Sequence, residues 1–281
     1  MMKISFLLNI LFYISIALIV ILLYMYDDEQ DEKNIKKYFA TFGDTKSRYN
    51  NSRMRIVSEA RDLNYFDDIF EYSEKSPELF NFFEEHKKFF EIHKRGYGYW
   101  LWKFYIVLET FKKINYGDVI LYADSGCTLS KNGIRRLNEY IELASEKKLV
   151  VFRLQYPEFN YTKGDVLDET KCDEQCFNGN QIMATAFIVK KCPEMEIFFE
   201  SLYETCIKYN YKLITDEPSK ILNKNGFVEH RHDQSIFSTM IKTKLTENDD
   251  VVILGNEVDI HPSRMILPYE GAIFPITATR K

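Results

Sequence analysis

Short apolar segments alternate with longer amphipathic ones along most of the chain, from residue 38 onward. The clearest apolar run of strand length is VILYA at residues 119–123, and the segments between such runs repeat their apolar residues every three or four positions, as one face of a helix does. Strands that alternate with helices form a mostly parallel sheet covered by helices, because parallel strands need long crossover connections. The pattern therefore predicts an α/β fold.

The predicted elements follow from this periodicity. Strands are expected at residues 37–42, 68–72, 119–123, 149–154, 184–189 and 251–254. Helices are expected at residues 52–63, 77–92, 99–114, 131–146, 194–209 and 233–245. Asp233 is placed to cap the N-terminus of the last helix.

Length and charge narrow the class of protein. The chain has 281 residues, of which 46% are hydrophobic and 28% charged, and this suits a folded domain with a sizeable core. The formal net charge of −5 provides no basic surface for phosphate backbones, so we expect no nucleic-acid partner.

Residues 4–26 are almost entirely apolar, with Asn9 as the one strongly polar side chain. A helix of roughly 20 residues spans the hydrocarbon core of a bilayer. Lys3 precedes the run and acidic residues follow it, and positive charge stays on the cytoplasmic side. A cleaved signal peptide is the alternative, but the end of the run lacks a small-residue cleavage pattern.

We therefore expect a single-pass type II membrane protein with its bulk outside the cytoplasm, in the Golgi or endoplasmic reticulum if the cell is eukaryotic. Its parts are a cytoplasmic tail (residues 1–3), a transmembrane signal anchor (4–26), a stem (27–37) and a catalytic domain (38–281). The chain has 5 cysteines, too few for a disulfide framework. Cys172 and Cys176 could pair, which would suit a lumenal domain, and a zinc site is less favoured because no second close pair accompanies them.

Asp124 follows the apolar run at residues 119–123 directly, and Ser125 and Gly126 come next. A buried strand thus delivers one carboxylate to its end, where small residues let a ligand approach the backbone. In open α/β sheets, ligands bind beyond the carboxyl ends of the strands. The alternative is a structural aspartate that caps the turn into the next helix, and the fragment alone favours neither.

This strand resembles the DxD strand of GT-A glycosyltransferases, the nucleotide-diphospho-sugar transferases that include glycogenin-like enzymes. In that family the first aspartate contacts the ribose and the metal ion, and the second binds the metal that neutralises the diphosphate. The resemblance implies that Asp124 and its neighbour Ser125 contact the nucleotide and that Asp124 contacts Mn²⁺ or Mg²⁺. Gly126 stands where the family has the second aspartate, and this departure weakens the expected metal site.

The segment RGYGYWLWK at residues 95–103 precedes the strand by one helix, as does the segment that contacts the nucleotide in related enzymes. Arg95 and Lys103 could hold a diphosphate, and the rings of Tyr99 and Trp102 could stack on a base or sugar. The alternative is that Trp100 and Trp102 pack in the core, and this holds for one of them, because positions i and i+2 on a helix face different ways.

The segment HRHDQS at residues 230–235 opens a helix, where free N–H groups favour an anion. Three potentially cationic side chains and one carboxylate converge there. It resembles the Asp-Gln motif of glycogenin-like transferases, which implies that Asp233 lies beside the donor sugar or acts as a base, and that His232 contacts the donor. A simple N-cap is the alternative, and capping is compatible with function.

The remaining motifs follow in the order of the GT-A family. By resemblance, Thr41 and Gly43 lie where the base and ribose enter, and Asn178 and Gln181 belong to a loop that cradles the donor sugar. Amide side chains suit sugar hydroxyls, because they donate and accept. His261 follows the last strand, where related enzymes have a histidine that completes the metal site.

The resemblance implies a glycosyltransferase that moves a sugar from a nucleotide-sugar donor to a hydroxyl of a glycan or glycoprotein. Asp124 and Asp233 are the expected catalytic residues, and Asp124 and His261 the expected metal ligands. A non-catalytic scaffold with a degenerate transferase fold is the second hypothesis, because Gly126 replaces an aspartate. The third is a metallohydrolase whose ligands are His230, His232 and Asp233.

Overall fold

The computed structural model describes residues 35–246, 249–258 and 273–279. The predicted cytoplasmic tail, the anchor at residues 4–26, most of the stem and His261 lie outside these ranges. Within the described ranges, no helix is both long enough and apolar enough to cross a bilayer. The folded domain begins at Lys37.

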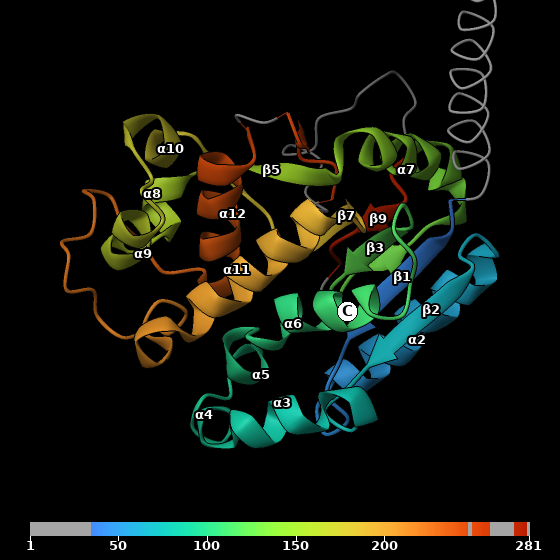
Figure 1. The fold of residues 1–281 in the computed structure, drawn as a ribbon, viewed down its shortest axis with the longest axis horizontal. Helices are drawn as coiled ribbons and strands as arrows, with labels where there is room; N and C mark the ends of the chain where they lie inside the picture. Colours follow the sequence, from blue (N-terminus) through green and yellow to red (C-terminus); the bar gives the residue numbers. More distant parts are fainter. Residues whose placement is uncertain (1–34, 247–248, 259–272, 280–281) are drawn as a thin grey trace, which may run out of the picture. The chain divides into compact units, whose positions relative to one another are not determined.

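A seven-stranded sheet forms the centre of the described part of this domain (Figure 1). Its strands lie in the order β2-β1-β3-β7-β5-β6, and β8 pairs with β5. The strands are β1 (Lys37–Phe42), β2 (Asp68–Tyr72), β3 (Val119–Ala123), β5 (Leu149–Pro157), β6 (Asn180–Ile182), β7 (Ala186–Lys190) and β8 (Val251–Leu254). A separate pair joins β4 (Thr128–Leu129) to β9 (Ile276–Thr277).

Most strands of the sheet run in one direction. β1 is parallel to β2 and β3, and β5 is parallel to β8. β7 is antiparallel to both β3 and β5, and β6 is antiparallel to β5. The predicted α/β fold with a mostly parallel sheet is therefore confirmed, with β6 and β7 as its reversed strands.

Helices cover both faces of the sheet (Figure 1). The long ones are α2 (Tyr49–Leu63), α6 (Trp102–Phe111), α7 (Ile134–Lys147), α11 (Pro193–Tyr211) and α12 (His232–Lys244). The short ones are η1 (Pro77–Leu79), α3 (Phe80–Glu85), α4 (Lys87–Ile92), α5 (Gly96–Tyr99), η2 (Lys131–Gly133), α8 (Glu158–Tyr161), α9 (Gly164–Glu169) and α10 (Glu174–Asn178).

Aromatic rings fill the core on the face that carries α6, α11 and α12. Tyr122 of β3 stacks on Phe187 of β7 with 4.8 Å between ring centroids, and Phe187 lies 5.2 Å from Phe237 of α12. On the opposite face, Tyr140 of α7 meets Phe152 of β5 edge to face at 5.2 Å. Because both faces are covered, β3 is buried along its whole length, as strands in parallel sheets are.

The single helix predicted at residues 77–92 is wrong in one respect. The structure has η1, α3 and α4 there, with a break at His86, whose φ of −99° and ψ of 16° are not helical. Both ring nitrogens of His86 are hydrogen bonded, Nδ1 to the hydroxyl of Tyr211 at 2.7 Å and Nε2 to that of Tyr203 at 2.6 Å. These tertiary contacts to α11 override the local helical pattern.

Two predicted helix starts also need correction. The helix predicted from residue 99 begins at Trp102, because Tyr99 and Trp100 have positive φ values of 51° and 59°. Asp233 is not the N-cap of α12 but its second residue, and Arg231 occupies the capping position without a side-chain bond. The carboxylate of Asp233 therefore does not cap the helix and lies beside the ammonium of Lys103 instead.

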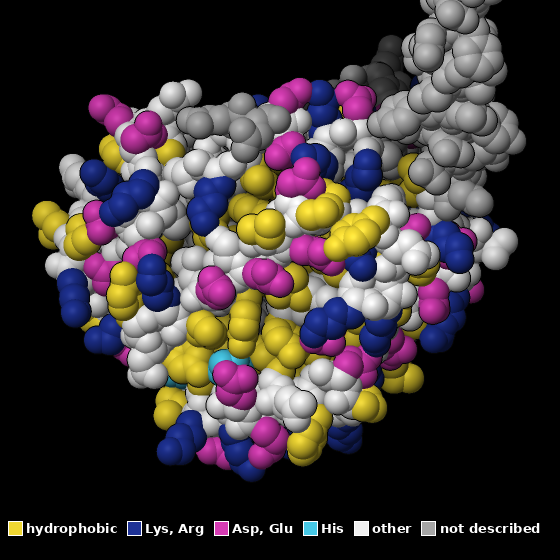
Figure 2. Space-filling view, in the orientation of Figure 1, with side chains coloured by type: hydrophobic (Ala, Val, Ile, Leu, Met, Phe, Trp, Pro, Cys, Tyr) yellow, Lys and Arg dark blue, Asp and Glu magenta, His cyan; other side chains and the backbone are white. Residues whose placement is uncertain are grey.

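Cys172 and Cys176 form a disulfide, as the sequence suggested. It closes the turn between α9 and α10, where Cys172, Cys176 and Leu167 make a small apolar cluster. On the face drawn in Figure 2, basic and acidic side chains are interspersed around a group of hydrophobic ones. The surface there carries no single large basic patch.

Candidate active site

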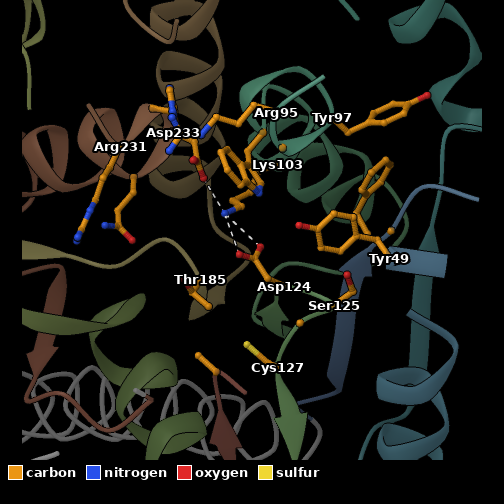
Figure 3. A pocket seen from close by; sticks show the side chains of 18 of the residues that line it. Tyr49, Arg95, Tyr97, Lys103, Asp124, Ser125, Cys127, Thr185, Arg231 and Asp233 are labelled. Atoms are coloured by element: carbon orange, nitrogen blue, oxygen red, sulfur yellow. Dashed lines mark hydrogen bonds and ion pairs between the residues drawn. The ribbon is translucent and has the colours of Figure 1, made fainter. Parts of the chain in front are cut away.

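Asp124 lies where the chain leaves β3, at the bottom of a pocket (Figure 3). Gly43 and Asp44, which follow the parallel neighbour β1, line the same pocket. Parallel strands end at one edge of a sheet, so the loops after β1 and β3 come together. Adding a Cβ to Gly43 would place it 2.7 Å from the backbone oxygen of Tyr49, so only glycine lets this loop approach α2 so closely.

Lys103 joins Asp124 to Asp233 (Figure 3). Its ammonium lies 3.2 Å from Oδ1 of Asp124 and 2.6 Å from Oδ2 of Asp233. It also donates to the backbone carbonyl of Ala184 at 3.0 Å, and the hydroxyl of Tyr122 donates to Oδ1 of Asp124 at 2.5 Å. Lys103 is the second residue of α6 and Asp233 the second of α12, so the starts of two helices meet at the end of β3.

Burial governs the electrostatics of this ionic cluster. Burial raises the pKa of Asp233 to about 6, although the ammonium of Lys103 acts in the opposite direction. Burial alone would lower the pKa of Lys103, but Asp124 and Asp233 outweigh it and the net shift is upward. Lys103 therefore stays charged. The side chain of Asp124 is 25% exposed against 5% for Asp233, so Asp124 offers the more accessible carboxylate.

The pocket above the cluster has a volume of about 550 Å³, within the roughly 300–1,000 Å³ typical of small-molecule sites. Six residues with phenyl, phenol or indole rings contribute to its lining: Phe42, Tyr49, Tyr97, Trp100, Trp102 and Tyr156. The pocket therefore combines flat apolar surfaces with the charged side chains of Lys103, Asp124 and Asp233.

Three arginines also line the pocket, Arg48, Arg95 and Arg231. Arg95 lies 3.8 Å from Glu229, and Arg231 lies 3.7 Å from the same carboxylate. The guanidinium of Arg231 also sits over the ring of Tyr161, 3.5 Å from its centroid. Arg95 also pairs with Asp216 at 3.5 Å. These ion pairs are long and partly exposed, so an anionic ligand could compete with the two carboxylates for the arginines.

Residues 96–100 enter the pocket in a strained conformation. Tyr97, Tyr99 and Trp100 have positive φ values of 50°, 51° and 59°, which cost of order 1–3 kcal/mol each in a non-glycine residue. At Gly98, with φ of 79°, an added Cβ would lie 2.4 Å from the ring of Phe90. Such strain is typical of functional sites, and here it turns Tyr97 and Trp100 into the pocket.

The two histidines of residues 230–235 are buried and neutral. Nε2 of His230 donates to the carbonyl of Leu213 and Nδ1 of His232 to that of Ile214, both at 2.8 Å. Burial lowers the pKa of His232 to about 4 and that of His230 well below its ordinary value. The expectation of three cationic side chains is therefore wrong, because only Arg231 carries a charge. Each imidazole also gives one nitrogen to the backbone, and no group of metal-binding side chains forms there within the described ranges.

The pocket gathers most of the site residues expected from the sequence: Gly43, Arg95, Trp102, Lys103, Asp124, Ser125, Gly126, His232 and Asp233.

Four others lie outside its lining. Thr41 donates to the carbonyl of Ala123 within the sheet at 2.8 Å, and the hydroxyl of Tyr99 donates to Asp216 at 2.9 Å. Asn178 ends α10, and Gln181 is fully buried.

Gln181 nevertheless supports the pocket from behind. Its side-chain oxygen accepts from Gln234 at 2.7 Å and from Arg231 at 3.4 Å, and both of these residues line the pocket.

Sequence reasoning missed the residues that α2 contributes. Arg48, Tyr49 and Ser52 line the pocket because the loop after β1 leads directly into this helix. Asp44 shapes that loop, since its carboxylate accepts from the backbone N–H groups of residues 46 and 47. An aspartate two residues after a buried strand and just before a helix was the signal available in the sequence.

The described residues do not supply a metal site around Asp124. No group of three or more His, Cys, Asp or Glu side chains in the described ranges is placed to hold an ion. Both oxygens of Asp124 lie near Lys103, and Oδ1 also accepts from Tyr122. Position 126 is glycine and adds no ligand, whereas hard divalent cations need several oxygens. Mn²⁺ or Mg²⁺ therefore does not fit this set, and His261 lies outside the described residues.

No protein-family model matches the sequence, and no curated protein matches it either. Three solved structures resemble the fold distantly. Mouse xyloside xylosyltransferase 1 has a TM-score of 0.45 at 10% identity, over 79% of this chain and 87% of that chain. A glycosyltransferase involved in glycosylation of the major capsid of PBCV-1 has a TM-score of 0.40 at 9% identity, over 80% and 84%. Mannose-6-phosphate isomerase from Helicobacter pylori has a TM-score of 0.35 at 11% identity, over 79% and 98%. Similarity at this level assigns no activity to this chain.

Proposed function

We propose that the domain at residues 38–281 is a glycosyltransferase, which moves a sugar from a nucleoside diphosphate donor to a hydroxyl group of a glycan or glycoprotein. The observation that carries the proposal is the cluster of Asp124, Lys103 and Asp233 at the bottom of a pocket of about 550 Å³. Rings and arginines surround the cluster. This combination suits a ligand made of a flat base, an anionic diphosphate and a sugar rich in hydroxyls.

Each part of such a donor has a chemical match in the pocket. A base or a sugar face can stack on Tyr49 or Trp100. Arg95 and Arg231 can form charge-assisted hydrogen bonds to the diphosphate, for which guanidinium groups are well shaped. The exposed part of the Asp124 carboxylate can accept hydrogen bonds from hydroxyls of the ribose or the sugar.

The reaction breaks the bond between C1 of the sugar and the diphosphate oxygen, which keeps the electron pair. The acceptor oxygen forms the new bond to C1, and its proton passes to a base. Asp233 suits that role, because a base works best when its pKa is near the operating pH and burial raises the pKa of Asp233 to about 6. Arg95 and Arg231 stabilise the charge on the leaving diphosphate.

We also propose that residues 4–26 anchor the protein in a membrane with type II topology, so that the catalytic domain lies outside the cytoplasm. The apolar length and the flanking charges support this topology. The disulfide between Cys172 and Cys176 suits an oxidising compartment such as the Golgi or endoplasmic reticulum.

A donor screen on the full-length protein tests the proposed activity. Thermal shift and donor hydrolysis would be recorded with UDP-, GDP- and CMP-sugars, in Mn²⁺ and in a chelator. We expect one donor to raise the melting temperature and to be hydrolysed slowly, and Asp124→Asn and Asp233→Asn to lose turnover. Asp168→Asn is the matched control, because this aspartate lies in α9 with its side chain 60% exposed. Full turnover in both site variants would refute the assignment.

A non-catalytic fold that only binds a nucleotide is the second candidate, and Gly126 at the place of an expected aspartate favours it. The same screen separates the two functions. Binding of one nucleotide without turnover, over a broad panel of acceptors, would support the binding protein.

A further inference from the structure

The ammonium of Lys103 is buried between two carboxylates and a backbone carbonyl. Its Nζ lies 2.6 Å from Oδ2 of Asp233 and 3.2 Å from Oδ1 of Asp124 as ion pairs, and it donates to the carbonyl of Ala184 at 3.0 Å. The side chain is 3% exposed, and its stem belongs to the buried start of α6. Lys103 is therefore a fixed positive charge between two carboxylates rather than a group that can reach out to a ligand.

We propose that Lys103 takes the place of a divalent cation at this site, so that a nucleoside diphosphate binds to this protein without a metal ion. The inference rests on the proposed function, since it concerns how the same pocket accommodates the donor.

A second cation at Asp124 would meet two obstacles. The ammonium lies 3.2 Å from one oxygen of Asp124 and 3.5 Å from the other, so a metal ion bound to either oxygen would sit within a few ångströms of a positive charge. Oδ1 also accepts from the hydroxyl of Tyr122 at 2.5 Å. The carboxylate thus has little capacity left for an ion that demands several oxygen ligands.

Lys103 cannot simply move aside for a metal ion. Its departure would leave Asp233 buried, with its side chain only 5% exposed, next to the carboxylate of Asp124. Two buried carboxylates repel each other, and the helix start that carries Lys103 is packed in the core. The fold therefore holds the lysine where it is.

The charge of a diphosphate has other partners in the pocket. Four cationic and four anionic side chains line it: Arg48, Arg95, Lys103 and Arg231 against Asp44, Asp124, Glu229 and Asp233. Lys103 is paired with two of these carboxylates and is buried. Arg95 is 49% exposed and pairs with Asp216 at 3.5 Å and Glu229 at 3.8 Å, and Arg231 lies 3.7 Å from Glu229. The arginines are thus the cations that can turn to a diphosphate.

Two titrations on the full-length protein test the inference. Free Mn²⁺ would be followed by electron paramagnetic resonance as protein is added, and UDP and GDP binding would be measured by calorimetry in Mn²⁺ and in EDTA. We expect no stoichiometric Mn²⁺ binding to the protein alone. We also expect the affinity for the nucleotide that binds to agree within about twofold between the two conditions.

Variants at position 103 test whether the lysine is what prevents Mn²⁺ from binding at this site. Lys103→Met should bind Mn²⁺ more tightly than the wild type does, at a pH of about 8 where Asp233 is more readily ionised, because the positive charge that repels the metal ion from Asp124 is gone. Lys103→Arg keeps the charge and should not gain Mn²⁺, so a gain in this variant would overturn the inference. If the methionine variant does not fold, the two titrations on the wild type decide. Lys148→Met is the matched control, since this lysine bridges Glu194 at 3.0 Å and Asp250 at 2.9 Å away from the pocket.

The outcomes separate this inference from the proposed function. Nucleotide affinity that rises about tenfold or more in Mn²⁺ overturns the inference while it supports a nucleotide site. If neither nucleotide binds in either condition, the proposed function fails, and the Mn²⁺ titration alone decides. In that case, saturable Mn²⁺ binding to the wild type that Asp124→Asn removes overturns the inference, and a gain confined to Lys103→Met supports it.

Discussion

Replacing Lys103 with methionine should destabilise the domain strongly and in a pH-dependent way. Methionine keeps most of the apolar stem of lysine and removes only the ammonium. The ammonium is within 3.2 Å of Asp124 and 2.6 Å of Asp233, and the side chain of Asp233 is only 5% exposed. The variant therefore leaves a buried carboxylate without its counter-charge.

The expected loss follows from this burial. Removing one partner of a buried ion pair costs about 3–5 kcal/mol, because the other charge stays buried and unpaired. Lys148→Met is the matched control, because Lys148 also bridges two carboxylates but is 26% exposed, with Glu194 at 54% and Asp250 at 16%. A partly exposed pair of this kind contributes at most about 1 kcal/mol.

The stability of Lys103→Met should depend on pH, and the pKa of Asp233 decides the direction. Burial already raises the pKa of Asp233 to about 6, and loss of the ammonium removes the main effect that opposes burial. In the variant, the folded chain therefore holds a proton on Asp233 at pH values where the unfolded chain has lost it. Stability must then fall as the pH rises, because the folded state binds more protons than the unfolded state.

Urea unfolding of the full-length protein and both variants, at about pH 5 and about pH 8, measures these effects. We expect the deficit of Lys103→Met to be several times that of Lys148→Met at the higher pH and to shrink at the lower one. Equal deficits of the two variants, or a Lys103→Met deficit that does not change with pH, would refute the argument that a buried, unpaired carboxylate is its cause.

Three further predictions concern the base, the strained segment and the disulfide. Turnover should rise with pH through about 6, the value to which burial raises the pKa of Asp233, and Asp233→Asn should be slow with no such rise in its pH–rate profile. Gly98→Ala should lower the melting temperature more than Gly117→Ala. Both glycines have positive φ, which costs an alanine about 1–2 kcal/mol at either position. An added Cβ would lie 2.4 Å from the ring of Phe90 at Gly98 but would meet nothing within 4 Å at Gly117. Equal shifts of the melting temperature would contradict this steric argument. Replacing Cys172 and Cys176 with serine should cost about 2 kcal/mol in urea unfolding, because the loop they close is short, and a much larger loss would mean that the bond does more than restrict the unfolded chain.

The bounds of four strands were the most predictable part of the fold. β1, β2, β3 and β8 begin and end at the residues expected from the sequence. Each is a compact run rich in β-branched and aromatic residues, and turn-forming residues such as Gly43 or Gly117 lie close to three of them. In β1 and β3 the local preference and the burial agree, and in the half-buried β2 and β8 the local preference alone matches the observed bounds.

Strand direction and helix breaks were not predictable in the same way. The residues of β7 do not indicate that it runs against β3, because direction depends on how α8, α9, α10 and β6 lead the chain back from β5. Residues 77–92 have a continuous helical pattern, and only the contacts of His86 with two tyrosines of α11 break it. The break at His86 depends on partners more than a hundred positions away, and the direction of β7 depends on a connection of several elements.

The burial of Lys103 was partly predictable from its neighbours in the sequence. A lysine between Trp102 and Phe104, in a helix that is otherwise apolar on its core side, is either at the protein surface or paired with a buried carboxylate. Asp124 and Asp233 were already the two aspartates expected at the site, and a buried ammonium between them satisfies all three charges. The same arrangement that makes the cluster stable removes the need for a metal ion as its counter-charge. Stability and metal dependence are therefore set by one side chain, and a lysine-to-methionine change should alter both together.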